Sequence, residues 1–110
     1  MLEVQEQLDQ FVLEIKNTQV YQEYQKQKNK IKEYPELKQQ IDEFRQKNFE
    51  LQSRTFPENL YDEVDKFQKE YEQFRDIPMV YDFLSAELAF CRMIQEVTTD
   101  IIESVSQDFE

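Results

Sequence analysis

The sequence contains no glycine, no histidine and no tryptophan, and these absences exclude most of the known catalytic motifs. Without glycine there is no phosphate-binding loop, no nucleophile elbow and no EF-hand loop. Without histidine there is no imidazole base and no zinc helix of the HExxH type. Neighbouring carboxylates such as Asp62 and Glu63 occur, but in so acidic a chain we expect them on solvated faces. The sequence therefore predicts no enzyme, no catalytic residue, no metal site and no cofactor.

Cysteine is nearly absent too, because Cys91 is the only one. One cysteine can form no intramolecular disulfide and cannot supply the four ligands of an iron–sulfur cluster. Arg92 follows it directly but points about 100° away on a helix, so no cation is evident that would activate the thiol. We expect a buried structural cysteine. The opening MLEVQEQLDQ has early acids and no basic stretch of a signal peptide, which predicts a cytoplasmic location.

Basic charge is scarce as well: 24 acidic residues stand against 13 basic ones, giving a net charge of −11. Binding to nucleic acid or to an anionic membrane surface relies on lysine and arginine, so both are disfavoured. The basic run at 24–32 is more typical of a solvated helix face. The most apolar stretch, 77–94, includes Asp82, Glu87 and Arg92, which make it too charged to span a membrane.

The lack of glycine and the clear helical periodicity predict an all-α fold, with residues 1–110 as a single domain. We expect an antiparallel helical hairpin or bundle of about four to five helices with a long C-terminal helix. Thr18 is a plausible N-cap of the second helix, and Pro35 predicts a break after Tyr34. The first helix carries its apolar residues on one face: Val4, Leu8, Phe11, Val12 and Ile15.

Two further segments carry apolar residues at alternating steps of four and three, the spacing of a coiled-coil seam. Between them, SRTFPEN supplies a turn, in which Thr55 and Glu58 fit a capping box. A short link between two such helices predicts an antiparallel hairpin. The two seams are Leu37, Ile41, Phe44, Asn48 and Leu51, and then Leu60, Val64, Phe67, Tyr71 and Phe74.

The last helix is expected to begin at Pro78 and to continue to about Ser106. Its apolar residues cover more than half of its circumference, so we expect it to be packed on most sides. It is either the central helix of the fold or a helix shared within an oligomer. Glu87 shares a face with apolar neighbours such as Phe83 and Phe90. In one alternative its carboxylate lies at the edge of that face and reaches water or a basic residue of its own chain. In the other, the carboxylate is partly buried and paired across a subunit or partner interface.

The stretches ELKQQIDEFRQKNFELQ and IPMVYDFLSAELAFCRMIQEVTTDII, in this order and with a hairpin between them, resemble the YlbF/YmcA family of small bacterial regulators. The resemblance covers roughly residues 8–102. It implies a cytoplasmic, non-enzymatic, helical protein that associates with itself and with relatives. It also implies roles in competence, sporulation and biofilm formation, in some members through a complex that modulates an endoribonuclease. Members linked to iron–sulfur clusters carry more cysteines than this chain, which argues against a cluster here. The matching positions are Phe44, Leu51, Pro78, Val80, Phe83, Ala86, Glu87 and Ile101.

The leading hypothesis is a regulatory adaptor that acts by protein–protein interaction, through its last helix and the hairpin, as a homodimer or larger oligomer. Its partners would be a second copy, family relatives or another regulatory protein, with no small-molecule substrate. The alternative is a passive helical scaffold or holdase-like chaperone. The residues expected at the interaction surface are Phe44, Leu51, Val80, Phe83, Glu87, Phe90, Ile94 and Ile101.

Overall fold

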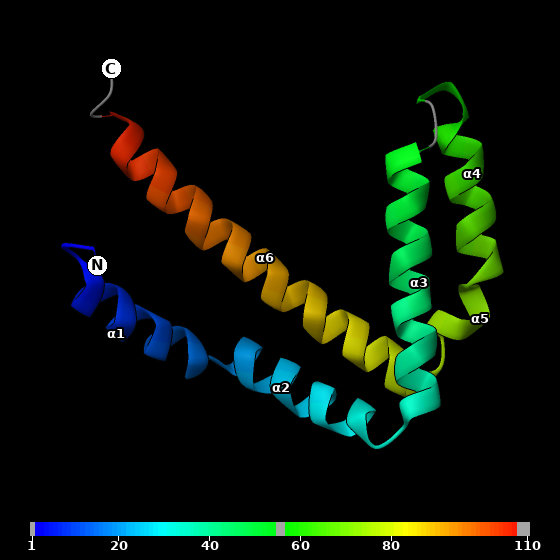
Figure 1. The fold of residues 1–110 in the computed structure, drawn as a ribbon, viewed down its shortest axis with the longest axis horizontal. Helices are drawn as coiled ribbons and strands as arrows, with labels where there is room; N and C mark the ends of the chain where they lie inside the picture. Colours follow the sequence, from blue (N-terminus) through cyan, green and yellow to red (C-terminus); the bar gives the residue numbers. More distant parts are fainter. Residues whose placement is uncertain (1, 55–56, 108–110) are drawn as a thin grey trace. The chain divides into compact units, whose positions relative to one another are not determined.

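The computed structural model describes residues 2–54 and 57–107, and every regular element in these ranges is a helix (Figure 1). The all-α prediction is confirmed. The helices are α1 (Gln5–Lys16), α2 (Gln19–Lys32), α3 (Pro35–Arg54), α4 (Pro57–Glu70), α5 (Glu72–Arg75) and α6 (Pro78–Ser106). The chain divides into two compact units: unit 1 is Met1–Gln27 with Leu84–Glu110, and unit 2 is Lys28–Phe83.

Each of the three prolines stands at the first position of a helix. Pro35 opens α3, Pro57 opens α4 and Pro78 opens α6. A proline suits this position because its φ is already helical and its missing N–H would have no partner within the helix. The predicted break after Tyr34 and the predicted start of the last helix at Pro78 are both confirmed. The expected capping box lies outside the described part of the chain, because it rests on Thr55 and on the side chain of Glu58.

Thr18 caps α2 as the sequence predicts. The Tyr21 backbone N–H donates a hydrogen bond of 3.1 Å to Thr18 Oγ1, which satisfies one of the free donors of the first helical turn. The same hydroxyl donates to the carbonyl of Ile15 at 2.7 Å. The Thr18 hydroxyl thus bonds both the last turn of α1 and the first turn of α2.

Replacing Thr18 with alanine is expected to lower the free energy of unfolding by about 1 kcal/mol, because the Tyr21 N–H loses its partner. Urea denaturation followed by circular dichroism measures this loss. Thr98→Ala is the matched control: its hydroxyl bonds only to the Ile94 carbonyl inside α6, and alanine favours a helix interior. Equal losses in the two variants would contradict a capping role for Thr18.

In unit 2, α3 and α4 form the predicted antiparallel hairpin (Figure 1). The seam of α3 faces the interior: Ile41 is 1% exposed, and Leu37, Phe44, Asn48 and Leu51 are partly buried. Among the described residues of this unit, the buried apolar side chains come from the end of α2, from α3 and from the first turns of α6. They are Ile31, Ile41, Val80 and Phe83.

The spacing of the second seam predicts one continuous helix. The structure differs, because α4 ends at Glu70 and α5 begins at Glu72. In an unbroken helix the Gln68 carbonyl would accept the Glu72 N–H. Here Arg75 Nη2 donates to this carbonyl at 3.2 Å. The Arg75 side chain thus bonds a backbone carbonyl at the break.

Unit 1 consists of α1, most of α2 and the part of α6 from Leu84 onward, and its core is thin. Helix α1 has no buried residue. The buried residues that the structure describes in this unit are Ala86 and Gln27, and Gln27 Nε2 donates to Glu23 Oε1 at 2.7 Å. In the described residues, no helix has the length and hydropathy needed to cross a membrane.

Candidate protein-interaction surface

The eight residues that the sequence singles out lie in both units and differ in burial. Val80 and Phe83 are 0% and 5% exposed, so their side chains belong to the core. Phe44 and Leu51 on α3, and Glu87, Phe90 and Ile94 on α6, are partly buried. Ile101 is 55% exposed. Of the eight, Ile101 is therefore the side chain that is most available to a partner, whereas Val80 and Phe83 could act only by supporting the helix that carries it.

Phe44 lies at the centre of an aromatic cluster in unit 2. Its ring stacks on Phe67 at 5.3 Å between centroids, meets Tyr71 edge-on at 5.2 Å and lies 6.0 Å from Phe74. Aromatic pairs in such offset and edge-on geometries add about 0.5–1.5 kcal/mol each beyond the burial of their area. The cluster joins α3 to α4 and α5, so the role that the structure gives Phe44 is to hold the hairpin together.

Two cations lie over rings of the same unit. The Arg45 guanidinium carbon is 5.2 Å from the centre of the Phe83 ring, and Lys47 Nζ is 5.4 Å from that of Tyr71. A hydrogen bond with Tyr71, together with charge interaction with it, raises the pKa of Lys47 above its usual value of 10.5. A raised lysine pKa favours the folded state below about pH 10.5 and stops doing so above it. The contact is therefore insensitive to pH near neutrality.

In unit 1, Phe90 connects α6 to α2. Its ring stacks on Tyr24 at 5.3 Å and meets Tyr21 edge-on at 5.7 Å. Beyond these contacts, toward the C-terminus, the apolar side chains of α6 become more exposed. Ile94 and Val97 are partly buried, whereas Ile101, Ile102 and Val105 are exposed. A single chain thus does not pack α6 on most sides as expected, since its C-terminal half has apolar residues in water.

Helix α1 has a similar exposed face, which the sequence reasoning described but did not include among the interaction residues. The side chains of Leu8, Phe11 and Val12 are 40%, 41% and 38% exposed. We call these three residues, together with Ile101, Ile102 and Val105, the open apolar surface. The four-and-three spacing of the first helix was the signal that could have identified α1 as part of it.

The expectation of a buried Cys91 is wrong, because the structure places this thiol at the surface. On a helix with apolar residues most of the way round, periodicity does not show which face turns toward the core. Leu88, three residues earlier, is exposed as well. Glu87 is partly buried and makes interactions in the structure, so whether it pairs across an interface stays a prediction.

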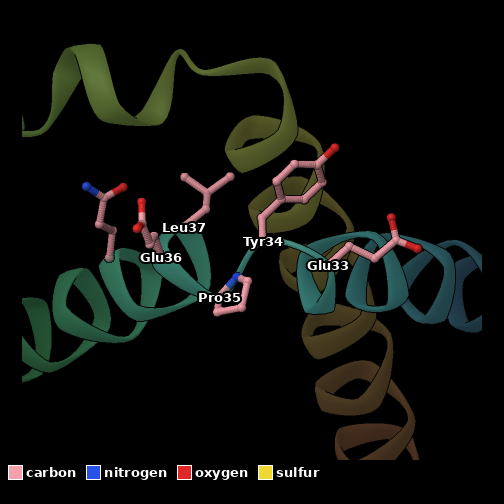
Figure 2. A pocket seen from close by; sticks show the side chains of 6 residues that line it. Glu33, Tyr34, Pro35, Glu36 and Leu37 are labelled. Carbon is pink, nitrogen blue, oxygen red and sulfur yellow. The ribbon is translucent and has the colours of Figure 1, made fainter.

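An open hollow of about 530 Å³ lies in unit 2 where α2 ends and α3 begins (Figure 2). The lining side chains offer two carboxylates, an amide and a phenol around a leucine and a proline. No nucleophile beside a base is present, so the hollow carries no acyl-transfer or hydrolytic constellation. Among the described residues, no cluster of acidic or sulfur side chains could hold a metal ion. The lining residues are Glu33, Tyr34, Pro35, Glu36, Leu37 and Gln40.

Comparison with known proteins identifies the relatives of this fold. The profile of a family described as "Control of competence regulator ComK, YlbF/YmcA" matches residues 4–106. The chain belongs to the YlbF/YmcA family. The match confirms the resemblance seen in the sequence, and the description is that of a regulatory family and not of an enzyme family.

A relative of this YlbF/YmcA chain is a "UPF0342 protein" from Caldicellulosiruptor bescii, which is 27% identical over 93 residues. The aligned region covers 83% of this chain and 78% of the relative. No solved structure matches the chain.

Proposed function

We propose that this YlbF/YmcA chain is a regulatory adaptor that works by binding proteins, among them a second copy of itself, in the cytoplasm of a bacterium. The proposal includes control of a competence regulator, which the family description names. Competence is linked in this family with sporulation and biofilm formation, and we extend the proposal to them. It involves no chemistry on a small molecule and no direct contact with nucleic acid or membrane.

One observation carries the proposal: α6 presents apolar side chains that are exposed in the part of the chain that the structure describes. Ile101, Ile102 and Val105 lie within two turns of one another and are about half exposed. Adjacent exposed apolar residues of this size are typical of surfaces that bind other proteins. The interaction surface proposed here is the open apolar surface with the partly buried Glu87, Phe90 and Ile94 beside it. Phe44, Leu51, Val80 and Phe83 lie in unit 2 and are not part of this surface.

Deleting the gene in the bacterium that encodes this chain is expected to change the expression of competence genes several-fold. The measurement is transcript abundance under conditions that induce competence, with the wild-type gene restored at another locus as control. Affinity capture of the tagged chain from the same cells should recover an untagged copy and a regulatory protein. Unchanged competence transcripts in the deletion strain would contradict the proposed pathway, even if the chain binds itself.

A holdase-like chaperone is the second candidate, favoured by the position of the exposed residues. Leu2 and Val4 precede α1, and Val105 lies in the last turn of α6, so both helices expose apolar groups near the chain termini. Apolar groups at such positions could hold an unfolded client. Suppression of light scattering by an aggregating client at equimolar chain would support this function, and no suppression at a tenfold excess would reject it.

A further inference from the structure

The hollow between α2 and α3 combines acidic, aromatic and apolar groups, with no base among the described residues that line it. The lining includes the carboxylates of Glu33 and Glu36, the phenol of Tyr34 and the amide of Gln40. Figure 2 shows Tyr34, Glu36 and Leu37 extending to the same side of the turn. A hollow of this composition is complementary to a positively charged group that also has an apolar part.

The polar side chains of this lining are available to a ligand. None of them makes a hydrogen bond, an ion pair or a ring contact with another residue that the structure describes. All of them are exposed, and Tyr34 is 50% exposed. Lys32 and Lys38 adjoin the lining in the sequence without being part of it, and Lys38 Nζ lies 3.8 Å from Asp42 Oδ2. The two carboxylates and the face of the ring therefore remain open to a cation.

Helix stability explains one of the two carboxylates but not the other. Glu36 lies in the first turn of α3, where a negative charge interacts favourably with the helix dipole. Glu33 directly follows α2, which ends at Lys32, and a negative charge is unfavourable at this end of a helix. A residue that breaks a local rule in this way is expected at a functional site, and a bound cation would compensate for it.

We propose that the hollow receives an arginine side chain of a protein to which this chain binds. The proposal rests on the protein binding that is part of the proposed function. A guanidinium has enough N–H donors for both carboxylates, and its plane stacks on an aromatic ring such as that of Tyr34. Its methylene stem fits the apolar surface of Leu37 and Pro35. Lysine has a compact charge that stacks less well on a ring, so the lining favours arginine.

The open form of the hollow favours a side chain held by a protein over a free cation. A small-molecule site ordinarily encloses most of its ligand, whereas the polar side chains here are all exposed. An exposed ion pair contributes little in water, because both charges remain hydrated. An arginine that arrives as part of a protein surface excludes water from the pair and adds its contacts to those around it.

Proton–nitrogen correlation NMR of the full chain tests the proposal with short peptide probes. One probe is a blocked peptide of alanine and serine with a single central arginine. In the matched probe citrulline replaces the arginine, which keeps the shape but removes the charge. The arginine probe is expected to bind with a Kd on the order of 1 mM and to shift the amide signals of residues 33–40. The citrulline probe should leave these signals in place, and about 0.5 M NaCl should weaken the arginine probe several-fold.

Three variants locate the binding site. Glu36→Gln and Tyr34→Leu should each weaken the arginine probe about two- to five-fold, because one removes a carboxylate charge and the other the ring face. Glu43→Gln is the matched control, since it makes the same change at an exposed position of α3 outside the hollow and should keep the wild-type affinity. Circular dichroism checks that the helices are intact. Glu33→Gln replaces Glu36→Gln if the loss of a charge in the first turn unfolds α3.

The outcomes separate this proposal from the proposed function. Shifts confined to residues 33–40 that require the arginine charge, and that weaken in Glu36→Gln and Tyr34→Leu but not in Glu43→Gln, would support it. Equal shifts with the citrulline probe, or equal affinities of Glu36→Gln and Glu43→Gln, would overturn it. Spermidine is the probe for a free cation, and shifts of the same amides at lower concentration than with the peptide would overturn the assignment to a protein side chain. A negative result leaves the competence pathway to be decided by the gene deletion, whose transcripts do not depend on these probes.

Discussion

Phe44→Ala is expected to lower the free energy of unfolding by about 3 kcal/mol, because it removes the ring at the centre of the aromatic cluster. Phe67, Tyr71 and Phe74 all have their ring centres within 6.0 Å of Phe44 and would face a cavity. The value lies at the low end of the range for phenylalanine truncation because the ring is partly exposed. Urea denaturation monitored by circular dichroism measures the loss.

Phe49→Ala is the matched control for this variant. Phe49 lies on the same helix and is the same residue type, but its side chain is 67% exposed. Its truncation removes little packing and leaves a good helix former, so the change should stay within about 0.5 kcal/mol. Similar losses for the two variants would show that the cluster does not hold the hairpin together. The pair thus separates the loss of a packed ring from the loss of any phenylalanine of α3.

The parts of the fold that depend on local chemistry could be predicted from the sequence. Thr18 caps α2 and the prolines at 35 and 78 open helices, because these effects act within one helical turn. The seam of α3 was also predictable, since a four-and-three spacing places its residues on one face whatever packs against them. The family could be recognised because the order and spacing of such local patterns extend through most of the chain.

The missed features depend on contacts that one helix does not reveal. The interruption at Tyr71 involves the Arg75 guanidinium and the Gln68 carbonyl, a bond across seven residues that apolar spacing does not report. Cys91 was expected to be buried because it lies among apolar residues, yet the structure exposes its thiol. Both α6 and α1 have a regular apolar pattern, and whether such a pattern meets a core or a partner is decided by tertiary structure.

Ile41→Ala should also lower the free energy of unfolding by about 3 kcal/mol, because Ile41 is 1% exposed and its side chain has almost no contact with water. Three methyl or methylene carbons would leave a cavity in unit 2. This unit supplies the other large buried apolar side chains that the structure describes, Ile31, Val80 and Phe83. A domain of this size has about 5–15 kcal/mol of stability, so the variant is expected to lose between about a fifth and three fifths of it.

Ile41→Val provides a graded comparison, since it removes one carbon and keeps the β-branched shape. It is expected to lower the free energy of unfolding by about 1 kcal/mol, so the two variants should fall in proportion to the volume removed. Thermal and urea denaturation should agree on this order. A loss below about 1 kcal/mol for Ile41→Ala would mean that the site collapses around the smaller residue. Because Ile41 belongs to unit 2, neither variant should change the proposed binding through the open apolar surface of unit 1, so stability and binding can be measured independently in the same proteins.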